Sequence, residues 1–348
     1  MKTEKNRYKI KEFSAFLLAL LVLFCLLFCN SCGKSFQKTV TTFACDTVVT
    51  ITYYDEKDEK AVNDALSYLS ELELVFSRTN ENSELYALNE ALHKDEFFVA
   101  GKELFQALTM AYEAAEESDG AFDFTLGNVS DLWDFTGETP HVPEEAVLAE
   151  TLSHTGYEKI HLEGIFVTDA EESNPGGYVS SEDASLSIDL GGMAKGYMGQ
   201  KLKDRLMEAG VESALLNLGG NVVTIGKKPD GSEFQIGISK PEKGSSEYVS
   251  TVGIANEAAV TSGIYQRYFE DGGKWYHHIL DPKTGRPVES DVASVTVIYR
   301  DSGMADILST TLFVAGPDYT ENYVKNCSQD ITVVYVMKDG SLKEFSNK

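Results

Sequence analysis

Asp306 and Thr310 could hold a metal ion, because they lie at positions i and i+4 of a segment that predicts a helix over residues 303–315. Residues with this spacing share one helix face. A carboxylate and a hydroxyl, completed by a carbonyl oxygen from elsewhere, suit a hard cation such as Mg²⁺. The alternative is structural: an acid favoured by the helix dipole near the N-terminus, and a threonine whose hydroxyl bonds back to the helix.

Two diglycine turns could present backbone amides to a phosphate group. Residues 187–196 (SIDLGGMAKG) predict a strand, a turn at 191–192 and the start of a helix, where free amides attract phosphate. The spacing matches neither G-x-x-x-x-G-K-[ST] nor G-x-G-x-x-G, so a plain tight turn is the alternative. The second turn, 219–220, also fits a bulge or a close backbone approach, with Asn217 and Asn221 as turn residues.

A pair of histidines occupies a predicted strand over residues 275–280. His277 and His278 are neighbours, and alternation directs neighbouring side chains to opposite faces of a strand. At most one of them therefore points into a given site. A general base is then a more natural role for one of them than joint chelation of a metal.

The glycine-rich segment 120–127 (GAFDFTLG) contains Asp123, which could cap a turn or ligate a metal. Trp133 and Phe135 follow it and could stack on a flat ring. The structural alternative for both aromatic residues is a place in the hydrophobic core.

The elements that must position these residues predict an α+β fold with largely antiparallel sheets and packed helices. Apolar residues at spacings of three and four predict helices, and Thr- and Val-rich runs predict strands. The helices cover 57–76, 101–118, 143–154, 303–315 and 317–326. The strands cover 38–54, short runs between 155 and 168, 234–239, 248–254, 258–261, 265–269, 275–280, 292–299, 331–337 and 341–346.

Between these elements, residues 184–226 predict the order strand, glycine turn, helix, strand, glycine turn, strand. Residues 120–142 are typical of a loop. The polar segment 169–183 (DAEESNPGGYVSSED) predicts an exposed hairpin tip or an insertion. No repeat or composition shift divides residues 38–348, which we expect to form one domain.

The composition excludes several classes of partner. The chain has 348 residues, 43% of them hydrophobic, which is enough for a core, and a formal net charge of −25. This acid excess argues against nucleic acid and against adsorption to anionic lipid, since both require clustered Lys and Arg. Residues 1–31 carry +3, so the remainder carries −28. A phosphate-rich small ligand would need a metal ion or backbone amides.

The N-terminus predicts a bacterial lipoprotein signal over residues 1–31, followed by a tether over 32–37. Basic residues between 2 and 11 precede the apolar run 16–28, which is short for a spanning helix. Cleavage after Ser31 would free the thiol of Cys32 for a diacylglyceryl group. Cys29 is the weaker candidate, because a bulky residue precedes it, and an uncleaved signal anchor is the alternative. We expect a lipid anchor on the extracytoplasmic face of the bacterial membrane.

The remaining cysteines, Cys45 and Cys327, form neither a disulfide framework nor a metal-binding pattern. A single bridge between them stays open. Nothing after residue 32 is long and apolar enough to predict a membrane span.

Taken together and in this order, the motifs resemble one family, the FAD:protein FMN transferases, also called ApbE or flavin transferases. The resemblance covers nearly the whole chain after the signal. It is carried by residues 43–47, 76–89 (FSRTNENSELYALN), 120–137, 188–196, 216–221, 261–269 (TSGIYQRYF), 278–287 and 294–315.

The resemblance implies an α+β fold with a T-fold-like core. It also implies an enzyme that cleaves FAD, moves FMN onto a Ser or Thr hydroxyl of another protein and releases AMP. Mg²⁺ would be held by Asp306, Thr310 and the carbonyl of Gly192. The implied flavin contacts, several of them through the backbone, are Cys45, Ser77, Arg78, Thr79, Ala121, Phe122, Asp123, Asp189, Lys195 and Leu280.

The residues fit such a reaction, because phosphoryl transfer needs charge neutralisation and positioning more than covalent help. Lys195 or helix-end amides would share the phosphate charge with Mg²⁺, and Asp306 would be essential to catalysis. The resemblance favours His278 over His277 as the base that takes the hydroxyl proton, with Asp281 as the second candidate.

Three departures from the family pattern affect the shape of the flavin pocket. The family often has Met-Gly-Thr where this chain has 45–47 (CDT), Pro at Phe124 and Gly at Asp134. None of them removes a group that the reaction needs.

Other functions remain open at this point. The same site could hydrolyse FAD to FMN and AMP, or bind flavin without chemistry. A general solute-binding lipoprotein fits poorly, because alternating βαβ units are absent from the predicted pattern. The chain has no Asp-x-x-[ST]-x-Ala-Thr acceptor motif. We therefore expect the target to be another protein, a subunit of an extracytoplasmic electron-transfer system.

Overall fold

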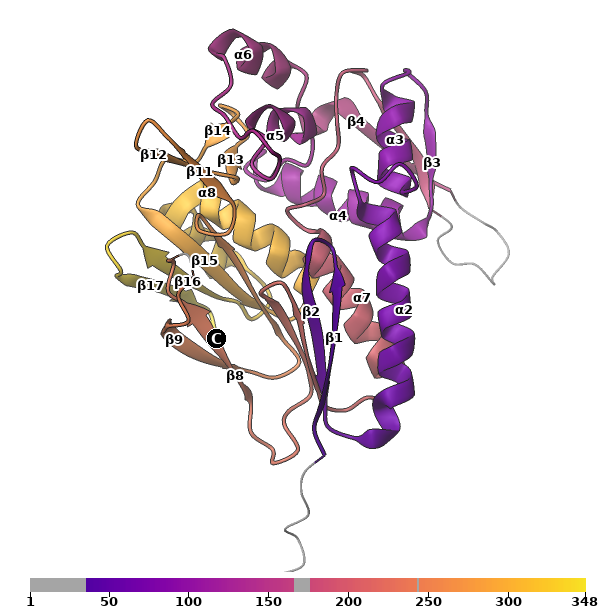
Figure 1. The fold of residues 1–348 in the computed structure, drawn as a ribbon, viewed down its shortest axis with the longest axis vertical. Coiled ribbons are helices and arrows are strands. Elements are labelled where there is room, and N and C mark those ends of the chain that lie inside the picture. The colour runs from indigo at the N-terminus through magenta and orange to yellow at the C-terminus, as the bar shows by residue number, and fades with distance from the viewer. Residues whose placement is uncertain (1–35, 166–175, 243) are drawn as a thin grey trace, which may run out of the picture. The chain divides into compact units, whose positions relative to one another are not determined.

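The computed structural model describes residues 36–165, 176–242 and 244–348 (Figure 1). The expected signal and the lipidation at Cys32 lie outside these residues. Residues Lys38–Lys348 form one compact unit. Its mixture of helices with antiparallel sheets confirms the expected α+β class. Within the described ranges, no helix combines the length and apolarity that a membrane crossing requires.

The largest sheet in the described residues has eight strands, and neighbouring strands run antiparallel. Thr, Val and Ile dominate these strands, whose branched side chains favour the extended backbone. The strands in spatial order are β1 (Lys38–Ala44), β2 (Thr47–Tyr53), β6 (Ala214–Leu218), β7 (Asn221–Ile225), β10 (Ala258–Gly263), β15 (Val292–Tyr299), β16 (Thr332–Met337) and β17 (Leu342–Ser346).

Long helices pack on this sheet. Helix α7 (Ala194–Glu208) lies against β6 and β7, and α8 (Ser302–Asn326) lies against β10 and β15. Helix α2 (Glu59–Phe76) packs on α7, as Figure 1 shows. Helix α8 begins at Asp301, whose Oδ1 accepts a hydrogen bond from Met304 N at 2.9 Å. At Gly316, where φ is 83°, the backbone leaves the helical conformation, so α8 consists of two helices joined at a kink, in agreement with the separate predictions for 303–315 and 317–326.

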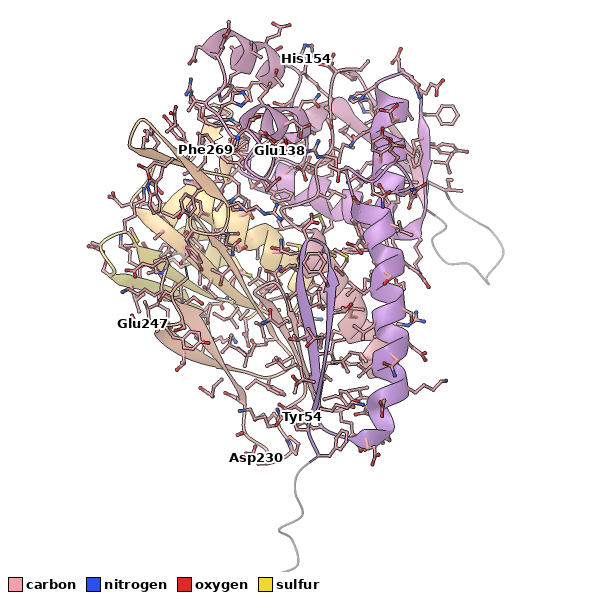
Figure 2. The ribbon with its side chains drawn as sticks, viewed as in Figure 1. Tyr54, Glu138, His154, Asp230, Glu247 and Phe269 are labelled. Atoms are coloured by element: carbon pink, nitrogen blue, oxygen red, sulfur yellow. The ribbon has the colours of Figure 1, made fainter. Side chains whose placement is uncertain are left out.

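A small hairpin packs against the same sheet. Strands β8 (Phe234–Ser239) and β9 (Tyr248–Ile254) pair with each other. Phe234, Ile238 and Ile254 of this hairpin join a buried cluster with apolar residues of β10, β15 and β16. Figure 2 labels Tyr54, whose ring lies 6.0 Å from that of Phe234.

The remaining elements build a second region around a small sheet. Its strands lie in the order β3 (Phe98–Ala100), β5 (Gly177–Ser181), β4 (Ile160–Gly164). Helices α3 (Glu84–Leu92), α4 (Lys102–Glu117), α5 (Gly127–Trp133) and α6 (Glu145–Ser153) accompany it, with the 3-10 turn η3 (Tyr157–Lys159). Two short strand pairs complete the described elements: β11 (Tyr268–Asp271) with β12 (Lys274–His277), and β13 (Leu280–Asp281) with β14 (Arg286–Pro287). Outside this region, the 3-10 turn η2 (Glu56–Asp58) directly precedes α2.

Trp133 anchors an aromatic cluster in this region. Its ring is fully buried, and its Nε1 donates to Gly285 O at 2.8 Å. Phe135 stacks on it with ring centroids 5.6 Å apart, and Phe269, labelled in Figure 2, packs against both. Trp133 thus belongs to the hydrophobic core, as the structural alternative expected. Phe135 also lines the cavity described below.

Several predicted boundaries were wrong. Residues 177–181, expected in an exposed tip, form the central strand β5, while 166–175 lie outside the described residues. Helices α3 and α5 were not predicted. Strand β11 starts at Tyr268, three residues later than expected.

The expected strand at the start of 184–226 is also absent. Ser187 makes only an isolated bridge with Leu126. Instead, the Asn89 side chain bonds both backbone groups of Ile188, accepting from its N at 2.8 Å and donating to its O at 3.0 Å. A side-chain amide therefore takes the place of a neighbouring strand.

Gly196 sets the closest approach between α7 and α8. A Cβ built on Gly196 would lie 2.3 Å from Ser302 O and 2.4 Å from Asp306 Cβ. Both distances are too short for any side chain, so glycine is required where the two helices cross.

We predict that Gly196→Ala destabilises the protein although alanine is the better helix former. The added methyl group must push α8 away from α7, and overpacking of this kind costs about 1–3 kcal/mol. Urea unfolding followed by circular dichroism measures the change. Gly164→Ala is the matched control, because its Cβ would lie 3.7 Å from the nearest atom, in Phe105. An equal free energy of unfolding for Gly196→Ala and the parent chain would contradict the packing argument.

Candidate functional site

One cavity of about 1180 Å³ gathers the residues singled out in the sequence. It takes in positions from nearly the whole length of the described chain. The predicted site residues that line it are Cys45, Ser77, Arg78, Thr79, Ala121, Phe122, Asp123, Asp189, Gly192, Lys195, His278, Leu280, Asp306 and Thr310.

Two tight hairpin turns form part of the cavity wall. In the β1–β2 turn, Cys45 and Asp46 have φ angles of 54° and 55°. In the β6–β7 turn, Gly219 and Gly220 have φ angles of 62° and 104°, so this diglycine is a two-residue hairpin turn and not a bulge. The two turns touch, because Gly219 N donates to Val48 O at 3.2 Å. The expected close backbone approach is therefore present.

Asp306 is the most deeply placed acid of the cavity. Its Oδ2 accepts a hydrogen bond from Gly196 N at 2.8 Å, so the carboxylate lies at the N-terminus of α7, the positive end of that helix dipole. Burial raises the pKa of Asp306, while Lys195, the Gly196 N–H and the nearby Asn221 amide lower it. The acid at the start of α8 is Asp301, so the structural alternative for Asp306 does not apply.

Thr310 does not bond back to its own helix among the contacts of the described residues. The hydroxyl groups that do so are Ser309, which donates to Asp306 O at 2.9 Å, and Thr311, which donates to Ile307 O at 2.8 Å. Thr310 Oγ1 instead contacts Ser262 Oγ at 3.2 Å. Its hydroxyl therefore stays at the cavity wall beside Asp306.

The site fits a hard cation by its donor chemistry. A Cβ on Gly192 would lie 3.9 Å from Thr310 Oγ1 and 3.3 Å from Phe122 Cε2, so a side chain here would press on Phe122 and occupy the corner beside Thr310. Within the described ranges, no group of three His, Cys, Asp or Glu side chains could hold a metal ion. A cation here would take oxygen ligands from Asp306, Thr310 and the backbone, leaving positions for ligand phosphates, which is how proteins usually bind Mg²⁺.

Lys195, Arg78 and Arg267 bring positive charge to the cavity, and the first two lie near Asp306 or Asp189. Lys195, in the first turn of α7, lies close enough to Asp306 to lower its pKa. Arg78 is held in place by Asp131, with two bonds of 2.7 Å and 2.5 Å, and by Asp189, whose Oδ2 lies 3.5 Å from its Nε. Asp189 in turn accepts from Gly191 N at 2.8 Å and so fixes the turn before α7.

The other implied flavin contacts come from loops that are tied to the core. Asp123 Oδ1 accepts from Thr125 N at 2.8 Å and from Thr125 Oγ1 at 2.6 Å, and burial raises the pKa of Asp123. Cys45 donates its N–H to Glu73 Oε1 at 2.7 Å, and burial raises the pKa of its thiol to about 12, so the thiol is neutral. Cys45 and Cys327 are both free.

The two histidines face different surroundings, as strand alternation predicted. His278 lines the cavity, and its Nδ1 lies 3.2 Å from Arg267 O. A carbonyl only accepts, so Nδ1 carries the proton and Nε2 is left free to accept one. Burial and the positive charge of Arg267 lower the pKa of His278.

His277 points into the core instead. Its Nε2 donates to Val288 O at 3.1 Å, and its ring meets Phe313 edge-on. Asp281 accepts a hydrogen bond from Lys283 N at 2.9 Å within its own turn and is not among the described residues that line the cavity. Of the three candidate bases, His278 has the geometry for the role.

Sequence reasoning missed several residues of the site. Asn221, expected as a turn residue, is buried and faces Asp306, with its Nδ2 too far from any partner in the described residues for a normal hydrogen bond. Ser262 contacts Thr310, and Arg267 faces the cavity beside His278. Ser262 and Arg267 belong to segment 261–269, which carried the resemblance without an assigned role.

Two of the departures from the family pattern fall on left-handed backbone. Asp46 and Asp134 have φ angles of 55° and 51°, a region that favours glycine but that aspartate tolerates better than most residues. At Asp134 the side chain also accepts a hydrogen bond from Thr139 N at 3.1 Å. The substitutions therefore keep the turns that glycine would make.

Comparison with known proteins agrees with this geometry. The model of the ApbE family matches residues 45–335. A protein of Klebsiella pneumoniae (strain 342) named FAD:protein FMN transferase is 31% identical over 287 residues, which are 81% of this chain and 84% of that protein. One of the same name from Treponema pallidum (strain Nichols) is 33% identical over 276 residues, 77% of this chain and 73% of the relative.

Solved structures resemble the whole fold. The ApbE protein of Thermotoga maritima has a TM-score of 0.77 and 31% sequence identity, covering 89% of this chain and 97% of its own. The apo form of the Pseudomonas stutzeri flavinyl transferase ApbE has a TM-score of 0.75 and 27% identity, with coverage of 91% and 96%. The family model spans well over half of the sequence, and the chain belongs to the ApbE family.

Proposed function

We propose that this chain is an Mg²⁺-dependent transferase that moves FMN from FAD to a Ser or Thr hydroxyl of another protein and releases AMP. The observation that carries the proposal is the single cavity that joins the Asp306–Thr310 pair to the residues expected to contact flavin. Membership of the ApbE family supports it, since curated relatives are named FAD:protein FMN transferases.

The chain's own groups suit the binding and positioning of a pyrophosphate. Lys195 and Arg78 bring positive charge to the cavity wall, and the N-terminus of α7 adds the positive end of a helix dipole. Mg²⁺, when bound by Asp306, Thr310 and the Gly192 carbonyl, would neutralise phosphate charge that these groups leave. The backbone and side-chain bonds around Asp306 and Arg78 hold the site in shape before a ligand arrives.

His278 provides the proton acceptor of the proposed reaction. The acceptor hydroxyl forms a bond to the FMN-side phosphorus, its proton passes to Nε2 of His278, and the bond between the two phosphates breaks to release AMP. The hydrogen bond from Nδ1 to Arg267 O holds the ring in the required tautomer. A neutral imidazole is available because the pKa of His278 is lowered.

We further propose that the protein works on the extracytoplasmic face of the membrane, anchored by lipid on Cys32. The signal-like sequence over residues 1–31 supports this location. A target in an extracytoplasmic electron-transfer system would then lie in the same compartment.

The first prediction from the proposed function tests transfer itself. The chain without residues 1–32, incubated with FAD, Mg²⁺ and a flavin-carrying acceptor domain from such a system, should add one FMN to the acceptor in intact-mass spectrometry. Asp306→Asn should slow this by about 100-fold or more, because it removes the charged ligand of the cation that would stabilise transition-state charge. The exposed Asp318→Asn, on the same helix, is the matched control.

AMP release without a modified acceptor would instead indicate FAD hydrolysis. Bound flavin without turnover would indicate a binding protein. Either result with a competent acceptor would contradict the proposed transfer.

The second prediction concerns the base. His278→Ala should lower the transfer rate at pH 7 by about 10²–10⁴-fold, the usual contribution of a general base. In the parent chain the rate should stay constant as the pH falls through 6.5, because the pKa of His278 lies below that ordinary value and the ring stays neutral. His277→Gln should keep the rate, since His277 faces the core. A full rate for His278→Ala at saturating FAD and Mg²⁺ would exclude this role.

The third prediction distinguishes the effect of a bound cation on FAD affinity from the effect of the overall charge of the protein. The described cavity is lined by more acids than bases, so FAD affinity should fall steeply when Mg²⁺ is removed by chelation. Raising the ionic strength should change the affinity far less, since screening acts weakly on buried pairs. Fluorescence titration of FAD measures both effects. Equal sensitivity to Mg²⁺ and to salt would contradict cation-assisted binding.

A further inference from the structure

Three hydroxyl groups connect the cavity wall to the interior of α8. Ser262 Oγ, on β10, lies 2.7 Å from Ser309 Oγ and 3.2 Å from Thr310 Oγ1. Ser309 Oγ lies 2.9 Å from the main-chain O of Asp306. Ser309 is fully buried, whereas Ser262 and Thr310 line the cavity. The chain of contacts thus runs from the cavity to a carbonyl that can only accept.

The direction of these bonds follows from counting protons. Each hydroxyl has one proton to donate. Ser309 gives its proton to Asp306 O, so in the 2.7 Å contact Ser262 must be the donor and Ser309 the acceptor. The proton of Ser262 is then committed, so in the 3.2 Å contact Thr310 must donate to Ser262.

The opposite direction would leave buried groups poorly satisfied. If Ser262 donated to Thr310, Ser309 would receive no proton from Ser262, and the inner 2.7 Å contact would require Ser309 to turn away from Asp306 O. The carbonyl at the inner end therefore sets the direction of the whole chain. A Thr310 hydroxyl that donates inward keeps its lone pairs available at the cavity.

We propose that Ser262 is a positioning residue that, together with Ser309, orients the Thr310 hydroxyl so that its oxygen lone pairs face the cation site. The inference rests on the proposed function, because that function places a divalent cation beside Asp306 and Thr310. A cation requires a lone pair, and a proton in its place would repel it. Ser262 and Ser309 act on the cation only through Thr310.

Helix α8 offers a comparison for this role. Thr311 is the next residue, is buried, and donates to Ile307 O at 2.8 Å, so it makes an ordinary bond to its own helix. It takes no part in the chain from Thr310 to Asp306 O in the described residues. Removing its hydroxyl costs a buried hydrogen bond without touching the cation site.

The test measures cation binding to the full-length chain without flavin, so it does not depend on turnover. Mn²⁺ is the probe, and the electron paramagnetic resonance signal of free Mn²⁺ gives the Kd. Ser262→Ala should raise the Kd about 10-fold, the range seen when a partner of a metal ligand is lost. Ser309→Ala should act in the same direction, because Ser262 can then donate to Thr310. Ser262→Thr keeps a hydroxyl and should retain most of the affinity.

The control is Thr311→Val, which should bind Mn²⁺ like the parent chain even if its thermal midpoint falls. Matching midpoints for Ser262→Ala and the parent chain show that the fold is intact. An unchanged Kd in Ser262→Ala and Ser309→Ala overturns the proposal, as does a parent chain that binds no Mn²⁺. Failure of FMN transfer with normal Mn²⁺ binding and a weakened Ser262→Ala would count against the proposed function alone.

Discussion

The hydrogen bond between Asp306 Oδ2 and Gly196 N is the contact on which the site depends. It joins the two helices that pack on the main sheet, and it exists only because residue 196 has no side chain to hold them apart. The carboxylate that closes this contact is also the one that faces the cavity. A single short distance thus couples the packing of α7 on α8 to the position of the proposed cation site, and a change that separates the helices also displaces Asp306.

The acidic character of the chain is compatible with a ligand that contains phosphate. Residues beyond the signal carry −28, and the cavity itself contains several acids, among them Asp306 and Glu73. Several of these carboxylates already have partners within the protein. Asp131 and Asp189 pair with Arg78, and Glu73 accepts a hydrogen bond from the Cys45 N–H. Local positive potential comes from Lys195 and the start of α7. Net charge therefore argues against nucleic acid polymers as partners but says little about the potential inside one cavity.

The sequence predicted which residues meet at the cavity better than it predicted the residues that hold them in place. The spacing of Asp306 and Thr310, the alternation of His277 and His278, and the amphipathic helices follow local periodicity, so they could be read directly. Asn89 and Ser262 could not, because their partners lie 99 and 47 residues away and depend on the tertiary fold. Strand β5 could not be predicted for a similar reason. Its segment has the composition of a loop, and it forms a strand because it pairs with β3 and β4. Hydrophobic periodicity depends on neighbouring residues in the sequence, whereas the hydrogen-bond partner of a buried polar group can come from a distant part of the chain.

The partners in the Gly196–Asp306 contact are 110 residues apart, and the cavity wall runs from Cys45 to Thr310. During synthesis the segments with Cys45, Arg78 and Asp123 emerge first, whereas the β6–β7 turn, His278, Asp306 and Thr310 emerge later. A chain that lacks α8 therefore cannot bring Asp306 and Thr310 to the cavity. A ligand that binds the finished cavity stabilises only the complete fold, so its binding would mark the end of assembly.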